Sequence, residues 1–377
     1  MSPAMIVAVP RESAVKERRV ALVPETVSRL RKSDVDVRVQ RGAGDAAAFP
    51  DALYADAGAS FADDARSLAE TADAVVTIGR PSDDVLAALR PGSVVVGFLN
   101  PLGDPSYVQR LADAKLTALA MEMIPRITRA QSMDALSSQS NIAGYKAVLL
   151  AAEALPKFFP MLTTAAGTIP PAKVLVLGAG VAGLQAIATA RRLGAVVSAY
   201  DVRAVVKEQI LSLGASFLEF DLGADAEAAG GYAKELTAEQ QERQRAWMVE
   251  QIGANDAIVT TALVPGRKAP VLISEAAVAA MKPGSVIIDL AAEAGGNCAL
   301  TVADQTVTSP NGVTIVGTTN LPSTMPADAS RLYSRNVYAL LSPWIKDGNL
   351  EIDMSDDVAK GAVVARDGKV LLGGNAS

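Results

Sequence analysis

The chain has 377 residues, of which 50% are hydrophobic, 20% charged and 4% aromatic. This length exceeds that of a usual single domain, so we expect a globular protein of two lobes, each with a sizeable core. The formal net charge of −6 argues against a nucleic-acid binder, because such proteins need a basic surface that displaces phosphate counterions.

Signals of compartment point to the cytoplasm. Cys298 is the only cysteine, so no internal disulfide forms, and the start MSPAMIVAVPRES lacks the basic and long apolar segments of a signal peptide. The longest apolar runs, such as AVLLAAEAL, are well short of the roughly 20 residues that span a bilayer. We therefore expect a cytoplasmic chain with no membrane span of its own.

Short β-rich runs alternate with helical patterns along the first third of the chain, which is typical of a parallel sheet covered by helices. The predicted strands lie at 5–10, 35–40, 74–79, 93–99 and 116–122. A long helix is predicted at 137–155, beginning among polar capping residues and ending before Pro156. This helix joins the first lobe to a second.

The alternation resumes in the second lobe, with strands predicted at 173–178, 195–201, 215–220, 255–262, 284–291 and 313–320. A helix is predicted at 327–345, and residues 361–372 are predicted to return to the first sheet as strands. The similarity of RPGSVVVGFLNP (90–101) to KPGSVIIDLAAE (282–293) indicates either similar units in both lobes or a chance likeness of two turns.

The predicted fold class is α/β, with two Rossmann-like lobes that contain parallel sheets and are joined by long helices. The first lobe is discontinuous and consists of residues 1–136 and 330–377. Residues 137–329 form the lobe that contains the nucleotide motif described next.

The most informative segment is KVLVLGAGVAGLQAIATARRLGAVVSAYDVR. Gly178, Gly180 and Gly183 form a GxGxxG directly after a predicted strand and at the start of a predicted helix. The first glycine allows a tight turn, the second lets the backbone approach a pyrophosphate, and the third lets helix and strand pack closely. The predicted contacts are Gly178, Ala179, Gly180, Val181, Ala182 and Gly183; an ordinary glycine-rich turn is the alternative.

Asp201 ends the next predicted strand, 18 residues after Gly183. An acid at this place accepts hydrogen bonds from a ribose 2′-OH and repels a 2′-phosphate, which favours NAD(H) over NADP(H). Asp201, Val202 and Arg203 are therefore predicted to contact NAD(H) in a cleft between the lobes. Arg203 weakens the preference slightly, and we favour its interpretation as a solvated surface charge.

Further motifs run through nearly the whole chain: RVALVPETV, PRITRAQSMDALSSQSN, GGYAKE, ALVPGRKAP and DLAAEAGGN. With the glycine fingerprint, they resemble the alanine dehydrogenase/transhydrogenase family, in particular the NAD(H)-binding alpha subunit (domain I) of its proton-translocating members. The resemblance implies Re/Si-specific hydride transfer between NAD(H) and NADP(H), coupled to proton translocation. It also implies a homodimer held at the inner face of the cytoplasmic membrane by NADP(H)-binding and membrane-spanning partner subunits. No metal site is predicted.

An alanine dehydrogenase-like activity is the alternative, and it needs a proton donor or acceptor beside the carbonyl or amine, typically a histidine with a lysine. The chain contains no histidine, and Arg80 stands before a proline where the relatives carry a lysine. Hydride transfer between two nicotinamides needs only close juxtaposition of the rings. A non-catalytic NAD(H)-sensing module is a third hypothesis.

The resemblance gives residues 126–137 a role in positioning the nicotinamide end of the cofactor. Arg126, Gln131 and Asp134 match the family's catalytic positions, with Ser132 and Ser137 beside them. An arginine and an amide can hydrogen-bond the carboxamide or phosphates, while an aspartate can hold the arginine in place. From the residues alone, Asp134 or Ser137 could equally be the N-cap of the long helix.

Two segments complete the predicted site. Residues 221–244 are predicted to form a loop followed by a helix, and the resemblance makes the loop a lid over NAD(H), with Tyr232 suited to closing it; a surface insertion is the alternative. Thr261, Ala262 and Leu263 follow a predicted strand, at the sheet edge where ligands of open α/β sheets bind. DLAAEAGGN either belongs to this site or is only a strand-end turn.

Overall fold

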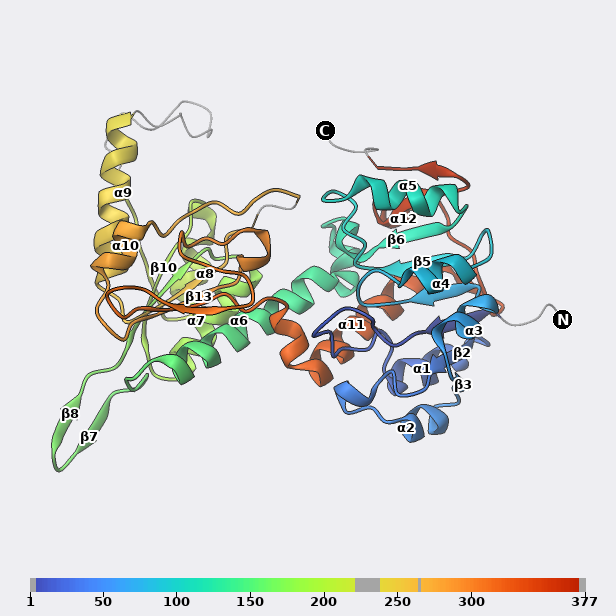
Figure 1. Cartoon of the computed structure of the whole chain (residues 1–377), viewed down its shortest axis with the longest axis horizontal. Helices are drawn as coiled ribbons and strands as arrows, with labels where there is room; N and C mark the ends of the chain where they lie inside the picture. Colours follow the sequence, from blue (N-terminus) through green and yellow to red (C-terminus); the bar gives the residue numbers. More distant parts are fainter. Residues whose placement is uncertain (1–4, 221–237, 264–265, 373–377) are drawn as a thin grey trace. The chain divides into compact units, whose positions relative to one another are not determined.

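The computed structural model describes residues 5–220, 238–263 and 266–372 (Figure 1). The chain divides into two compact units, Met1–Gln139 with Pro322–Ser377, and Ser140–Leu321. Each unit is built on one large, mainly parallel sheet with helices, which confirms the predicted α/β fold class. Among the described residues, no helix combines the length and the apolar character needed to cross a bilayer.

The first unit has an eight-stranded sheet of order β19-β18-β6-β5-β4-β1-β2-β3. The strands from β6 to β3 pair in parallel, whereas β18 is antiparallel to β6 and β19 is antiparallel to β18. The prediction that the tail returns to the first sheet is thus confirmed. The strands are β1 (Ile6–Val9), β2 (Asp36–Gln40), β3 (Ser60–Ala62), β4 (Ala74–Val76), β5 (Val94–Gly97), β6 (Thr117–Ala120), β18 (Val363–Arg366) and β19 (Lys369–Val370).

Hydrophobic cores cover both faces of this sheet. Val7 and Val9 of β1 join one buried cluster, while Ala8 between them joins the other. Because both faces are buried, the strands consist of continuous apolar runs rather than alternating ones. The helices of this unit are α1 (Pro24–Arg31), α2 (Asp51–Asp56), α3 (Ala65–Glu70), α4 (Asp83–Ala88), α5 (Pro105–Asp113), α11 (Pro326–Leu341) and α12 (Asp357–Ala362), and a short strand pair is formed by β16 (Ile345–Lys346) and β17 (Asn349–Leu350).

The second unit has a seven-stranded sheet of order β11-β10-β9-β12-β13-β15-β14, in which β14 is antiparallel to β15 and the other neighbours are parallel. Numbered along the chain within each unit, the parallel strands of both sheets follow the doubly wound order 3-2-1-4-5-6. β5 and β13 are both fifth strands, so the similar segments 90–101 and 282–293 occupy equivalent places. The strands are β9 (Lys173–Leu177), β10 (Val196–Tyr200), β11 (Ser216–Phe217), β12 (Ala257–Thr260), β13 (Val286–Asp289), β14 (Thr306–Thr308) and β15 (Thr314–Val316).

The long predicted helix is α6 (Ala135–Ala154), which begins in the first unit and continues in the second. It packs closely on the start of α7, because a Cβ added to Gly144 would lie 2.1 Å from the carbonyl oxygen of Ala182. A β-hairpin projects from the second unit (Figure 1). The remaining elements of this unit are β7 (Leu162–Thr164), β8 (Gly167–Ile169), α7 (Val181–Arg192), α8 (Lys207–Ser212), α9 (Ala238–Gly253) and α10 (Glu275–Ala280).

Glu12 follows β1 and links two loops at the carboxyl edge of the first sheet. Its carboxylate accepts hydrogen bonds from the N–H groups of Ile78 (2.6 Å) and Gly79 (3.3 Å), which follow β4. Burial is the largest effect on this group and raises the pKa of Glu12 from 4.5 to about 7, although both hydrogen bonds oppose the shift. The folded protein therefore binds the Glu12 proton more tightly than the unfolded chain does.

We expect Glu12 to make the protein less stable as the pH rises from 4.5 to about 7. Below this window Glu12 is protonated in both the folded and the unfolded state, and above it Glu12 is ionised in both. Replacing Glu12 with Gln should remove a pH-dependent part of the unfolding free energy on the order of 2 kcal/mol, measured by urea unfolding across the window. Glu25→Gln, at an exposed carboxylate of α1, is the control that should retain it. The same slope in Glu12→Gln as in the wild type would refute the assignment.

Candidate functional site

The GxGxxG segment forms the turn from β9 into α7, and each glycine has its own structural reason. Gly178 has a φ of +97°, and a Cβ there would lie 2.5 Å from the Thr261 hydroxyl oxygen. A Cβ on Gly183 would lie 1.9 Å from the carbonyl oxygen of Gly178. Gly180, by contrast, would meet no atom within 4 Å. The first and third glycines allow close packing, whereas the second leaves the turn open to a ligand.

The start of α7 fits an anionic group such as a pyrophosphate. Gly180 is the N-cap, and its position provides no side-chain hydrogen bond to the first N–H groups of the helix. Those N–H groups, of Val181, Ala182 and Gly183, have no acceptor within the helix and lie at the positive end of its dipole. Backbone donors beside an open approach are the arrangement with which a helix N-terminus binds phosphate.

The two glycines give a matched pair of variants. Gly183→Ala should lower the unfolding free energy by about 3 kcal/mol and abolish NADH binding, because its Cβ overlaps a carbonyl oxygen. Gly180→Ala should leave the melting temperature nearly unchanged, since its φ of −76° suits alanine and no atom opposes its Cβ. It should still weaken NADH binding, because the methyl group fills the open approach. Thermal unfolding and titration calorimetry measure both effects; equal stability of the two variants would contradict this account.

Asp201 follows β10, and its carboxylate is engaged by its own surroundings. Oδ2 accepts the N–H of Ala179 (2.7 Å), and both oxygens bind the Arg203 guanidinium, at 3.0 Å from Nε and 2.9 Å from Nη2. Burial on its own would raise the pKa of Asp201, but the hydrogen bonds from Arg203 and Ala179 outweigh it and hold the pKa below its ordinary value. The interpretation of Arg203 as a solvated charge is wrong, since it is the ion-pair partner of Asp201. Val202 between them is 84% exposed.

Residues after β12 lie beside the glycine turn. The Thr261 N–H donates to the carbonyl oxygen of Leu177 (2.9 Å), and its hydroxyl donates to that of Gly178 (3.2 Å). Leu263 is 54% exposed. The glycine turn, the 201–203 segment and the 261–263 segment therefore gather at the carboxyl edge of one sheet, as the sequence predicts. Asn297, which also contacts Ala262, was assigned no role from the sequence, although it lies in the DLAAEAGGN motif.

The predicted nicotinamide-positioning residues belong to the first unit, on and around the 3₁₀ helix η3 (Thr128–Met133). Arg126, Gln131 and Ser132 are exposed. The backbone of Ser132 is anchored by Asn336 of α11, whose amide donates to its carbonyl oxygen (2.8 Å). Within the region of the chain that the structure describes, the side chains of Arg126 and Gln131 have no hydrogen-bond or ion-pair partner. Both are therefore free to bind a ligand.

Asp134 has a different role from the one predicted. Its Oδ1 accepts the N–H of Ser137 (2.9 Å) and its Oδ2 accepts the Ser137 hydroxyl (2.6 Å), at the start of α6. The expectation that Asp134 holds Arg126 is wrong for this structure, because the carboxylate caps the helix instead. The N-cap interpretation thus applies to Asp134 and Ser137, whereas it does not account for Arg126 or Gln131.

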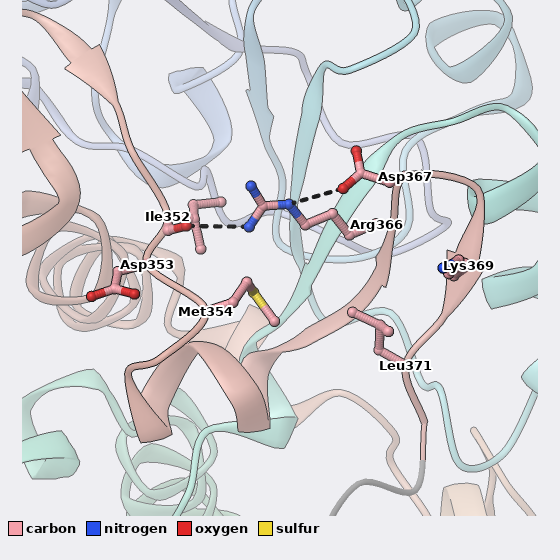
Figure 2. A pocket seen from close by; sticks show the side chains of 7 residues that line it. All are labelled: Ile352, Asp353, Met354, Arg366, Asp367, Lys369 and Leu371. Atoms are coloured by element: carbon pink, nitrogen blue, oxygen red, sulfur yellow. Dashed lines mark hydrogen bonds and ion pairs between the residues drawn. The ribbon is translucent and has the colours of Figure 1, made fainter.

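Two predicted features do not enter this description. Tyr232 and the rest of the predicted lid loop, 221–237, lie outside the described residues. A surface cavity of about 480 Å³ in the first unit (Figure 2) contains no predicted site residue. Its main cation, Arg366, is bonded to the carbonyl oxygen of Ile352 (3.2 Å) and paired with Asp367 (3.5 Å). The cavity is therefore separate from the candidate site.

Comparison with known proteins agrees with this geometry. The family models described as "Alanine dehydrogenase/PNT, N-terminal domain" and "Alanine dehydrogenase/PNT, C-terminal domain" match residues 8–143 and 147–373. The first of the polypeptides named as NAD(P) transhydrogenase subunit alpha in Rhodospirillum rubrum is 48% identical, over 97% of this chain and 98% of the relative. Alanine dehydrogenase of Bacillus subtilis is 30% identical, over 85% of this chain and 81% of the relative.

A solved structure extends the similarity to three dimensions. The crystal structure of transhydrogenase from Sinorhizobium meliloti has a TM-score of 0.87 and 44% sequence identity, and the match covers 97% of this chain and 99% of that one. The similarity thus includes both units and the glycine turn between β9 and α7. With two family models that together cover almost the entire described chain, this protein belongs to the alanine dehydrogenase/PNT family.

Proposed function

We propose that this chain is the NAD(H)-binding subunit of a proton-translocating transhydrogenase. The observation that carries the proposal is the 48% identity to a transhydrogenase alpha subunit over 98% of that relative, against 30% for alanine dehydrogenase. NAD(H) is the cofactor, and the glycine turn, Asp201 and residues 261–263 hold its pyrophosphate and adenosine parts. The partner reactant is NADP(H) on another subunit.

The chain's own residues bind and orient rather than exchange protons. Bound NAD(H) supplies the hydride, or accepts it, at its nicotinamide ring. Arg126 and Gln131, whose side chains are free among the described residues, hold the carboxamide end in one orientation. Because hydride transfer between two nicotinamides needs no acid or base at the reacting carbons, accurate positioning is the main requirement.

The structure disfavours the alanine dehydrogenase alternative at Arg80. This side chain donates to the carbonyl oxygen of Leu99 (2.9 Å), pairs with Asp104 (2.8 Å) and stacks over the Tyr107 ring at 4.2 Å. A guanidinium held in this way remains charged and cannot serve as the base that amine chemistry needs. The chain also has no histidine. Its amino-acid dehydrogenase activity with NADH, pyruvate and ammonia should therefore be absent.

We further infer a homodimer that works on the cytoplasmic face of a membrane, docked on NADP(H)-binding and membrane-spanning subunits. The projecting β7–β8 hairpin supports dimerisation, because Met161 at its base is 64% exposed and Ile169 is 41% exposed. Large apolar side chains on a protruding arm favour burial against another protein surface. Transfer is Re/Si-specific in this proposal, and proton movement is coupled to it through the partner subunits.

Reconstitution in sealed vesicles tests the coupling. The chain is combined with NADP(H)-binding and membrane-spanning subunits of a transhydrogenase, and internal pH is followed with a fluorescent dye during hydride transfer. Proton movement that starts with the addition of this chain and stops when the membrane is made proton-permeable supports the proposal. Transfer at full rate with no proton movement in tight vesicles would refute the coupling.

A further inference from the structure

Asn297 is fully buried in the loop after β13, and its side chain is bonded to residues that follow β12. Its amide nitrogen donates to the carbonyl oxygens of Ala262 (2.9 Å) and Pro270 (2.8 Å). Its Oδ1 accepts the N–H of Ala262 (3.0 Å). One side chain therefore fixes both backbone polar groups of Ala262 and also the far end of the loop that Ala262 begins.

Ala262 lies against the glycine turn. The preceding residue, Thr261, bonds the carbonyl oxygens of Leu177 and Gly178, and a Cβ added to Gly178 would lie 3.5 Å from the Ala262 nitrogen. The backbone at Ala262 thus forms a wall beside the turn whose N–H groups face the ligand. A side chain that holds this wall in place acts directly on the shape of the site.

Asp289 holds Asn297 in turn. Its Oδ2 accepts the N–H groups of Asn297 (2.7 Å) and Cys298 (3.0 Å) and the Thr301 hydroxyl (2.6 Å), while Oδ1 accepts the Thr260 hydroxyl and the Ala291 N–H, both at 2.9 Å. Asp289 is 1% exposed, and all five donors are neutral. A buried carboxylate satisfied by donors from one loop fixes the shape of that loop.

We propose that Asn297 is a positioning residue for NAD(H) binding. It holds Ala262 and the loop that follows in the place the cofactor requires, and Asp289 supports it one step further back. The inference rests on the proposed function, since it needs NAD(H) at the carboxyl edge of the second sheet. Asparagine suits the place because its side-chain amide offers a donor and an acceptor to the N–H and C=O of a single residue.

The test compares Asn297→Ala with a matched control, Asn311→Ala. Asn311 lies in the same unit, before β15 at the amino edge of the sheet, and its amide donates to the carbonyl oxygens of Val278 and Met281, both at 3.0 Å. Both variants lose backbone-directed hydrogen bonds and should melt at a lower temperature. Only Asn297→Ala should raise the Kd for NADH, by about tenfold in titration calorimetry well below the melting temperature.

Hydrogen exchange supplies a second measurement that does not depend on the ligand. In Asn297→Ala the amide of Ala262 should lose protection, while the amides of β12 should keep theirs. Should Asn297→Ala fail to fold, Asn297→Ser, which retains a polar group at this place, takes the same two measurements. Wild-type NADH affinity in a folded Asn297 variant, or an equal loss of affinity in Asn311→Ala, would overturn the proposal. A wild-type chain that does not bind NADH would instead refute the proposed function.

Discussion

Replacing Gln131 with Asn is expected to slow hydride transfer about a hundredfold while changing NADH affinity only modestly. Gln131 is exposed on η3, and its amide has no partner among the described residues. The substitution retains the amide but shortens its reach by one methylene, so the nicotinamide is held less accurately while the pyrophosphate and adenosine contacts persist. Because an amide does not titrate near neutrality, the pH profile of transfer should not change.

Single-turnover transfer to an NADP analogue on the partner subunit measures this effect. Gln109→Asn is the matched control, since it makes the same change on α5, where the amide nitrogen bonds only the exposed Asp113 (2.8 Å). The control should transfer hydride at the wild-type rate. A normal rate in Gln131→Asn as well would show that this segment does not position the ring and serves only to start α6.

The second large effect is expected at Asp201. The wild-type chain should bind NADH much more tightly than NADPH, because an ionised Asp201 repels a 2′-phosphate. In Asp201→Asn the side-chain oxygen can still accept the Ala179 N–H, but Arg203 loses the ion pair that now occupies it. The freed guanidinium then meets a 2′-phosphate without a competing carboxylate. The ratio of the two affinities should therefore shift toward NADPH by roughly a hundredfold, as expected for losing one repulsion and gaining one charged contact.

A double variant separates these two causes. Asp201→Asn with Arg203→Ala should lose the gain in NADPH affinity but not the loss in NADH affinity. Asp256→Asn is the control, since Asp256 also pairs with a cation, Lys157 (2.8 Å), but lies at the amino edge of the same sheet. It should leave the ratio unchanged. If titration calorimetry found the wild-type ratio in Asp201→Asn, Asp201 would not determine cofactor choice.

The large features of the fold were predictable because long-range burial leaves a clear pattern. Strands such as β5 and β13 are buried on both faces and consist of unbroken apolar runs. The tail strand β18 and helix α11 could likewise be identified by their periodicity. Strands of two or three residues, such as β3 and β14, could not, because so few positions show no period. The hairpin of β7 and β8 is exposed along its length and has no apolar alternation to detect.

The site was predictable where chemistry depends on local sequence. Gly178 and Gly183 are needed by backbone contacts within a few residues of one another and by Thr261, so their spacing alone indicates the turn. The ion pair of Arg203 with Asp201 was not predicted, because a neighbouring acid and base can equally point apart. The role of Asn297 depends on contacts with Ala262 and Pro270, which lie 35 and 27 residues away. Single-sequence patterns contain no signal for such pairs.

Direct transfer of deuterium tests the central claim most closely. The chain is mixed with an NADP(H)-binding transhydrogenase subunit, NADH labelled with deuterium at the transferred position of C4, and an oxidised NADP analogue in ordinary water. The account predicts that the reduced analogue carries the deuterium, because hydride passes from ring to ring without a protein acid or base. Reduced product that contains solvent hydrogen in place of the label, or product formed only with pyruvate and ammonia present, would contradict it.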